Sequence, residues 1–223
     1  MIILLDNGHA KSTKGKRSPD GTFYEYEFNR DIVKRISESL TKNKIDFHII
    51  TPELELDVPL SERANRVNNY CSIYGAGNCL LISVHANAAG NGSQWMTGRG
   101  WSVYTTKGQT NSDKYATLIY KEAEKIIPTL GSKMRADYSD GDPDWEENFT
   151  LLYKAKCPAI LTENLFYDSR SDLKILQSEA GRQAIADIHT NFIKQRGKKW
   201  VFLQLRILNS KSLPTSSRNT LLA

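Results

Sequence analysis

Cysteine is scarce in this sequence of 223 residues. The three cysteines, Cys71, Cys79 and Cys157, are odd in number and lack Cys-x-x-Cys spacing, which argues against both a disulfide framework and a thiolate zinc site. A pair between Cys71 and Cys79 stays open as an alternative. Three buried, unreactive thiols are the simpler expectation.

Long apolar runs are also missing. No stretch of the chain approaches the roughly 18 apolar residues that a membrane-spanning helix needs, so we expect no integral membrane segment. The N-terminal sequence Met-Ile-Ile-Leu-Leu-Asp has no basic segment before its short apolar run, and so it does not resemble a signal peptide. We therefore expect synthesis in the cytoplasm without export by the general secretory route.

Acidic residues are absent after Asp187, whereas seven of the 30 basic residues follow it. The net charge of +5 is therefore a property of the C-terminal end, and the rest of the chain is close to neutral. A nucleic-acid groove needs positive charge on the folded body, so we expect no nucleic-acid partner. The basic end suits a polyanionic surface such as a cell wall, or it serves only solubility.

Apolar segments with strand character alternate with segments of helical periodicity. Strands are expected at residues 2–5, 45–50, 79–84, 101–105 and 158–162. The apolar stripe of the first helix consists of Phe28, Ile32, Ile36 and Leu40. The alternation predicts an α/β fold, a mostly parallel twisted sheet flanked by helices on both faces, in a single domain over residues 1–195.

Residues 196–223 form a basic C-terminal tail outside this alternation, and its role is left open. The tail contains the apolar run 200–208, for which a packing strand, an oligomer contact and foreign sequence are the alternatives. The sequence does not predict an oligomeric state.

Two of the four histidines follow strongly apolar segments. His9 ends the run Leu-Leu-Asp-Asn-Gly-His, and His85 ends the run Leu-Ile-Ser-Val-His. Ligands of open α/β sheets bind beyond the carboxyl ends of the strands, so two imidazoles at two such ends can converge. For either one alone, a loop histidine is the ordinary role. His48 and His189 are expected to be structural or solvated, because no chelating residue stands beside them.

A carboxylate in front of the first predicted helix completes a candidate metal site. Glu25 stands three residues before Phe28 and extends the apolar stripe toward the sheet, whereas Glu27 groups with the outward face. Two histidines and one glutamate, with a fourth position left for water, form a known arrangement of catalytic zinc. We therefore expect His9, Glu25 and His85 to hold Zn²⁺.

A further carboxylate, Glu163, directly follows the apolar segment 158–162. Zinc-assisted hydrolysis requires a group that accepts a proton from water, and a carboxylate at the end of a third strand can do this. A salt-bridged or helix-capping surface glutamate is the alternative for this position. We interpret Glu163 as the catalytic residue.

These residues occur in four short motifs in a fixed order. The motifs are Asp6-Asn-Gly-His9, Glu25-x-x-Phe-Asn29, Ser83-Val-His85-Ala-Asn87-Ala and Pro158-Ala-Ile-Leu-Thr-Glu163. Each motif is weak alone, but together they resemble the zinc-dependent N-acetylmuramoyl-L-alanine amidases over about residues 1–195. That family usually has Pro at Asn7, Gly-Gly at Ala10-Lys11 and Gly at Leu165, and these departures bear on substrate preference.

The resemblance implies a peptidoglycan amidase whose catalytic domain covers residues 1–195. Zinc would be held by His9, Glu25 and His85, and Glu163 would be the catalytic carboxylate that cleaves between N-acetylmuramic acid and L-alanine. A zinc peptidase acting on the stem peptides and a non-catalytic wall-binding protein are the alternatives on the same fold. The family's wall-binding repeats and a signal peptide are both missing, which suggests a lysin of the phage type that reaches the cell wall on lysis.

Overall fold

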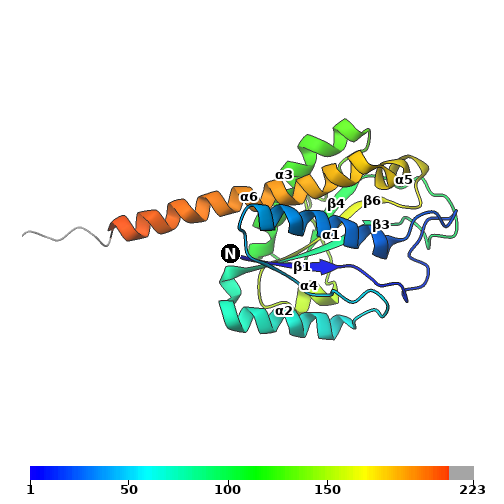
Figure 1. Cartoon of the computed structure of the whole chain (residues 1–223). Helices are drawn as coiled ribbons and strands as arrows, with labels where there is room; N and C mark the ends of the chain where they lie inside the picture. Colours follow the sequence, from blue (N-terminus) through cyan, green and yellow to red (C-terminus); the bar gives the residue numbers. More distant parts are fainter. Residues whose placement is uncertain (211–223) are drawn as a thin grey trace, which may run out of the picture.

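A six-stranded sheet forms the centre of the molecule (Figure 1). The computed structural model describes the backbone of residues 1–210 and the side chains of residues 1–195. The strands are β1 (Ile2–Asn7), β2 (Phe47–Ile49), β3 (Cys79–Asn87), β4 (Trp101–Thr105), β5 (Trp145–Glu146) and β6 (Ala159–Phe166). Their order across the sheet is β2-β1-β3-β6-β4-β5. The first four in this order are parallel, while β4 runs antiparallel to β6 and parallel to β5.

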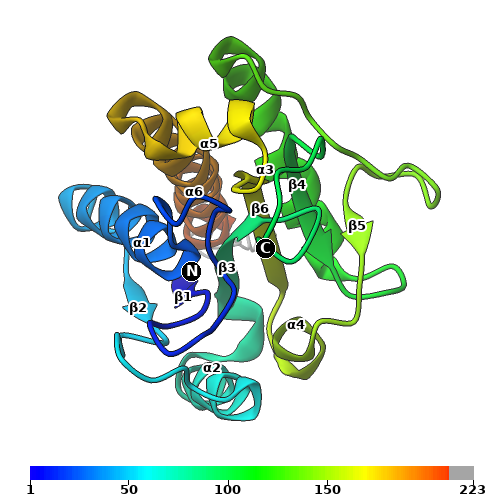
Figure 2. The same cartoon turned by 90° about the vertical axis from the view of Figure 1, so that its right-hand side faces the viewer.

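Helices cover both faces of the sheet, as predicted. They are α1 (Glu25–Lys42), α2 (Leu60–Tyr74), α3 (Asn111–Ile126), α4 (Thr150–Lys154), α5 (Arg170–Gln177) and α6 (Glu179–Ser210), with short 3-10 helices at Ala76–Asn78 and Ile127–Leu130. One buried cluster joins α1, α3, α5 and α6 to the sheet, and a second joins α2 and α4 to its other face. Figure 2 views the end of the molecule at which β1, β3 and β6 lie side by side between these layers.

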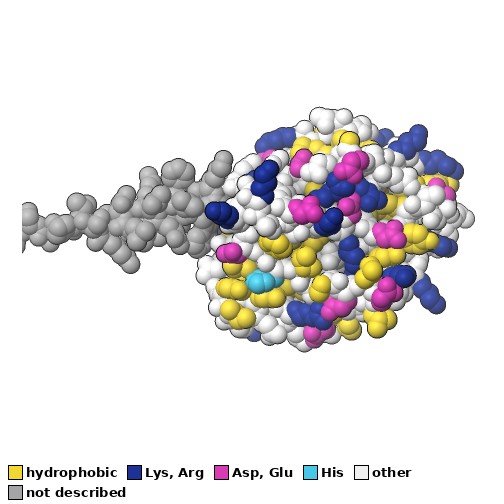
Figure 3. Space-filling model, in the orientation of Figure 1, with side chains coloured by type: hydrophobic (Ala, Val, Ile, Leu, Met, Phe, Trp, Pro, Cys, Tyr) yellow, Lys and Arg dark blue, Asp and Glu magenta, His cyan; other side chains and the backbone are white. Residues whose placement is uncertain are grey.

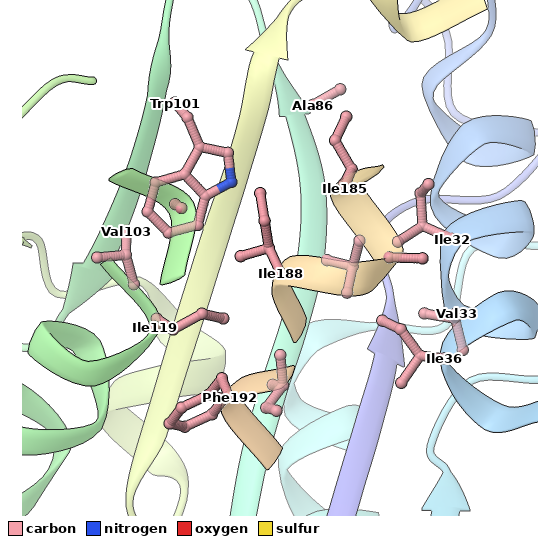
Figure 4. Packing of buried hydrophobic residues seen from close by; sticks show 14 of the residues in the cluster. Ile32, Val33, Ile36, Ala86, Trp101, Val103, Ile119, Ile185, Ile188 and Phe192 are labelled. Atoms are coloured by element: carbon pink, nitrogen blue, oxygen red, sulfur yellow. The ribbon is translucent and has the colours of Figure 1, made fainter. Parts of the chain in front are cut away.

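The apolar stripe of α1 sets the rotation of this helix against the sheet. Its predicted members Phe28, Ile32, Ile36 and Leu40 are all fully buried. Figure 4 shows the labelled side chains of α1 meeting Ile185 and Ile188 of α6 in front of the strands. Glu25 lies three residues before Phe28 and seven before Ile32, on the same helical face. Packing of the stripe therefore turns Glu25 toward the sheet.

Strands β1, β3 and β6 and the first helix extend further than the sequence predicts, whereas β2 is shorter than the predicted segment 45–50. α1 begins at Glu25, so this residue stands in the first turn and not in front of the helix. β3 continues past His85 to Asn87, and β6 continues past Glu163 to Phe166. The reason is that β3 and β6 stay paired beyond these positions, through an irregular register between His85 and Asn87. His85 and Glu163 thus lie within strands, near their carboxyl ends.

The C-terminal part differs from one of its expectations. α6 continues in helical conformation through Ser210, so the alternative of a packing strand at 200–208 is wrong. Figure 1 shows this helix running out from the body beyond the sheet. The side chains of residues 196–210 and the whole of residues 211–223 lie outside the described part of the chain, where the predicted basic tail falls.

The remaining expectations concern thiols, membrane segments and surface charge. Cys71, Cys79 and Cys157 are free and buried, and the alternative disulfide between the first two does not form. None of the helices described is both long and apolar enough to cross a membrane. On the face drawn in Figure 3, basic and acidic side chains are interspersed, and no field of a single sign gathers there.

Candidate metal centre

His9 stands two residues beyond the end of β1, in a backbone conformation that few residues other than glycine adopt. Its φ is +63°. Arg30 Nη1 of α1 donates a hydrogen bond of 2.8 Å to the carbonyl of His9, and Asn29 Nδ2 donates one of 2.9 Å to the carbonyl of Gly8. These bonds from α1 hold the turn in which His9 presents its imidazole beside the sheet.

Glu25 lies between the two histidines. Its side chain is only 1% exposed. Oε1 accepts a hydrogen bond of 3.2 Å from the backbone N–H of Ala86 and is 3.0 Å from His85 Nδ1. Oε2 is 3.5 Å from His9 Nε2 and has no hydrogen-bond partner among the described residues. Burial favours the neutral acid, but the hydrogen bond and charge of His85 outweigh it and lower the pKa of Glu25.

His85 packs against a residue that has no side chain. A β-carbon on Gly8 would lie 2.3 Å from His85 Cε1, closer than any real contact of this kind. The ring centroids of His9 and His85 are 5.0 Å apart, with the planes at 89°. Asn164 Nδ2 donates a hydrogen bond of 2.8 Å to the carbonyl of His85, which ties this part of β3 to β6. The open space over Gly8 therefore lets the two imidazoles meet edge to face.

The three side chains predicted from separate motifs converge in space. One ligand atom from each of His9, Glu25 and His85 lies within 4.8 Å of the other two. Burial lowers the pKa of His9 to about 4, so its imidazole is neutral at pH 7 and offers a lone pair. The geometry and the charge of this cluster suit a divalent cation.

Glu163 is the direct neighbour of His85 across the β3–β6 pair. Burial raises the pKa of Glu163 to about 7, although the positive charges of His85 and Lys16 oppose the shift. Its Oε2 is buried without a hydrogen-bond partner, and no ion pair to Glu163 occurs among the described side chains. The alternative of a salt-bridged glutamate is therefore not what the described part of the structure contains. A carboxyl group with a pKa near neutrality can accept and return a proton.

Two cavities with different linings reach the cluster. A cavity of about 670 Å³ reaches His9, His85 and Glu163 and has an apolar outer wall. That wall consists of Val58, Pro59, Leu60, Phe149 and Leu151. A second cavity of about 360 Å³ reaches Glu25, His85 and Glu163 and is lined by Lys14 and Lys16 among others. The cluster is therefore accessible from open space at the surface.

The other two histidines are structural, as predicted. His48 of β2 stacks on Tyr70, with ring centroids 4.1 Å apart, and its Nε2 is 3.2 Å from the hydroxyl of Tyr74. His189 of α6 is fully buried, 2.9 Å from Thr162 Oγ1 through Nε2 and 2.8 Å from the carbonyl of Ile185 through Nδ1.

Several residues that shape the centre were not identified from the sequence. Gly8 and Asn29 lie within the motifs. Their spacing does not reveal that Gly8 leaves room for the ring of His85, or that Asn29 donates a hydrogen bond to the carbonyl of Gly8. Arg63 gives a clearer signal, because it falls four residues before Val67 on the buried stripe of α2. A fully buried arginine is almost always paired. Its partners are Asp6 and Asp57, at 2.7 and 2.5 Å.

A sequence profile described as N-acetylmuramoyl-L-alanine amidase matches residues 3–195. The chain belongs to this family. Among characterised members, the amidase CwlM of Bacillus licheniformis is 30% identical over 85% of this chain and 66% of its own length. The endolysin of Bacillus phage SPP1 is 24% identical over 87% of this chain and 65% of its own length. This family member thus spans about two thirds of the length of these relatives.

Solved structures of the family share the fold. The catalytic domain of the amidase CwlV from Bacillus (Paenibacillus) polymyxa superposes with a TM-score of 0.72 at 19% identity, over 88% of this chain and 98% of that domain. An N-acetylmuramoyl-L-alanine amidase from Clostridium difficile 630 gives a TM-score of 0.70 at 23% identity, over 87% of this chain and 95% of that one. The expected mostly parallel α/β architecture is therefore confirmed for this amidase family member.

Proposed function

We propose that this protein is a zinc-dependent hydrolase that cleaves the amide bond between N-acetylmuramic acid and L-alanine in peptidoglycan. The observation that carries the proposal is the meeting of His9, Glu25 and His85, with Glu163 beside them and without an ion-pair partner in the described structure. Membership of the N-acetylmuramoyl-L-alanine amidase family supports the choice of bond.

The residues present fit a zinc ion. Imidazole nitrogens and a carboxylate oxygen are its usual ligands, and three protein ligands leave a position for water or substrate. Glu25 Oε2 supports this assignment, because it is a buried, negatively charged oxygen that lacks a hydrogen-bond donor. A buried carboxylate oxygen without a partner is costly unless a cation or a donor satisfies it. His9, Glu25 and His85 would hold the ion.

Bound zinc supplies a Lewis acid that polarises the scissile carbonyl and makes water more acidic. Glu163 accepts the proton of the water that attacks the lactyl carbonyl carbon. It then delivers this proton to the L-alanine nitrogen as the C–N bond breaks, because an unprotonated amide nitrogen is a poor leaving group. The products are a free lactyl carboxyl group on the glycan and a stem peptide with a free amino terminus.

Metal analysis combined with product identification tests the proposal. The purified protein is expected to contain about one zinc per chain and to release intact stem peptides from purified sacculi, detected by mass spectrometry. Fragments of the stem peptides would instead identify a zinc peptidase. Wall binding without any products, in the presence of added zinc, would identify a non-catalytic wall-binding protein.

Glu163→Gln separates the proton-transfer role from metal binding. Gln keeps the shape of the side chain but is not a base at pH 7, so turnover is expected to fall by roughly 100-fold or more. Zinc content is expected to stay at the wild-type level. The matched control is Glu38→Gln, an exposed position on α1 far from the cluster, which should keep full activity. Near-normal turnover of Glu163→Gln would contradict the assigned role.

We also propose that residues 1–195 form the catalytic domain and that the protein acts on the bacterial cell wall. The similarity to the endolysin of a Bacillus phage supports a lysin that meets its substrate after release from the cytoplasm. In this proposal the basic residues 196–223 are not required for hydrolysis.

A further inference from the structure

A chain of charged side chains lies behind His9, on the side away from Glu25. His9 Nε2 faces Glu25 Oε2 at 3.5 Å, and the other ring nitrogen, Nδ1, faces Asp57 Oδ2 at 3.8 Å. The imidazole thus lies between two carboxylates, of which only Glu25 belongs to the metal cluster. Asp57 was not identified from the sequence and has no part in the chemistry proposed above.

Asp57 is held in place from three directions. Thr13 Oγ1 donates a hydrogen bond of 2.5 Å to Oδ2, the oxygen that faces His9. Arg63 Nη2 donates to Oδ1, and the backbone N–H of Asp57 donates a hydrogen bond of 3.0 Å to Ser12 Oγ. The oxygen next to His9 therefore has a defined position.

Arg63 connects Asp57 to the sheet. Its side chain is 3% exposed, and its Nη1 donates hydrogen bonds of 2.7 Å to Asp6 Oδ1 and 2.9 Å to the carbonyl of Asn7. Asp6 in turn accepts a hydrogen bond of 2.6 Å from Ser83 Oγ of β3. The arginine neutralises two carboxylates at once, so its own charge and that of Asp6 can stay buried. Polar contacts thus connect β1 and β3, through Arg63 and Asp57, to the imidazole of His9.

We propose that Asp57 is a positioning residue that accepts a hydrogen bond from His9 Nδ1–H and so leaves Nε2 free to bind the cation. This inference rests on the proposed zinc site. Metal-binding histidines generally donate their second ring nitrogen to a carboxylate or carbonyl, which fixes the tautomer and the ring orientation. The need is greatest at His9, because it stands in a turn with φ of +63° while His85 is part of a strand.

Zinc affinity measured by competition with a chromogenic chelator tests this role in the full chain. Asp57→Asn keeps the shape of the side chain but loses its charge, and we expect binding weaker by about 10- to 100-fold. Asp57→Glu should recover part of the affinity, because it restores a carboxylate. The matched control is Glu55→Gln on the same loop, whose exposed carboxylate pairs with Lys11 and does not contact His9. This control is expected to bind zinc like the wild type.

Two further measurements distinguish positioning from general support of the fold. The zinc-loaded wild type should show a downfield imidazole N–H resonance of His9 that Asp57→Asn lacks, whereas the unfolding midpoints of the two metal-free proteins should be similar. If Asp57→Asn does not fold, Thr13→Val removes the hydroxyl that holds Asp57 Oδ2 in place, with zinc binding expected to weaken several-fold.

Wild-type zinc affinity in Asp57→Asn, or in Thr13→Val where that variant replaces it, would overturn the inference. Absence of zinc binding by the wild type would overturn it as well. The affinity measurement does not depend on hydrolysis. A wild type that binds zinc but leaves sacculi intact would therefore contradict the proposed function. The inference about Asp57 would still be decided by the zinc affinities of the variants.

Discussion

At the scale of single residues, the metal centre depends on one missing β-carbon. Gly8 lies under the ring of His85, and any side chain there would meet Cε1, Nδ1 and Nε2 of that ring at 2.3 to 2.6 Å. The added side chain would collide with the imidazole of His85. Glu25 holds this ring, so the ring could not move aside without leaving the cluster. Gly8 is needed for the close approach of the His85 ring. A special φ is not the reason, because Gly8 does not have a positive φ.

Gly8→Ala is therefore expected to displace His85 and to weaken zinc binding. A positional error of about 1 Å in one ligand is enough to spoil a metal site, so we expect at least a tenfold loss of zinc affinity in a chelator competition. Gly77→Ala is the matched control, since nothing lies within 4 Å of its added carbon. Unchanged zinc affinity in Gly8→Ala would show that the ring is free to move.

At the scale of secondary-structure elements, His189 connects α6 to the central strand β6. The carbonyl of Ile185 accepts the hydrogen of Nδ1, so Nε2 accepts from the hydroxyl of Thr162 and the imidazole is neutral. Burial lowers the pKa of His189 to about 4. A positive charge on this ring would be desolvated, with no carboxylate beside it among the described side chains.

Stability is therefore expected to fall as the pH falls. In the unfolded chain the histidine titrates near its ordinary pKa of 6.5, so between about pH 6.5 and 4 the unfolded state binds more protons than the folded state. From pH 7 to pH 5 this residue should cost about 2 kcal/mol of unfolding free energy. Urea denaturation of the metal-free protein at both pH values measures the loss.

His189→Gln should reduce that loss by about the same amount, because Gln does not titrate. His48→Gln, at a partly exposed position stacked on Tyr70, is the control and should leave the difference between the two pH values nearly unchanged. An equal pH dependence in wild type and His189→Gln would show that the buried imidazole does not cause it.

The periodicity of apolar residues made the main helices and strands predictable. Elements that exist only through pairing with another segment were difficult to predict. The stripe from Phe28 to Leu40 fixed both the helix and its buried face, and so indicated Glu25. The two-residue strand Trp145–Glu146 has no periodicity to detect, since it exists only through its pairing with β4. Leu165 has φ of +68° at a position where the family usually has Gly. The sequence could not indicate this conformation for a leucine, because tertiary packing holds it there.

The candidate site was predictable in its members but not in its supports. The structure brings His9, Glu25, His85 and Glu163 together, and their residue types at the ends of apolar segments had pointed to the proposed site. The hydrogen bonds of Asn29, Asp57 and Arg63 join segments far apart in the chain. Such contacts depend on how the elements pack, and no spacing in the sequence encodes them.

At the scale of the whole molecule, the last buried side chains of the described core precede the basic residues 196–223. Ile185, Ile188, Phe192 and Ile193 of α6 are buried, and Gln195 Nε2 still donates a hydrogen bond of 2.8 Å to Glu122 of α3. The family match also extends to residue 195. Seven basic residues follow Asp187, six of them after Lys194. We therefore expect hydrolysis to depend on residues 1–195 and not on the basic residues that follow.

Deletion of residues 197–223 is expected to preserve zinc content and turnover of soluble peptidoglycan fragments within about twofold, because no buried side chain described here is removed. The full-length chain with the same buffer and zinc load is the reference, and unfolding midpoints check that both forms are folded. Binding to intact sacculi at low salt measures any contribution of the tail separately. Loss of turnover in the shortened chain would contradict a catalytic domain that ends near residue 195.

The order of the strands also separates two events during synthesis. His9, in the loop after β1, Glu25 of α1 and His85 of β3 are all made before residue 88, whereas β6 with Glu163 is made much later and inserts between β3 and β4. A nascent chain still attached to the ribosome thus already contains every proposed ligand of the cation but not the residue proposed to transfer the proton. In this proposal metal acquisition can precede enzymatic competence, and the last central strand to be synthesised completes the site.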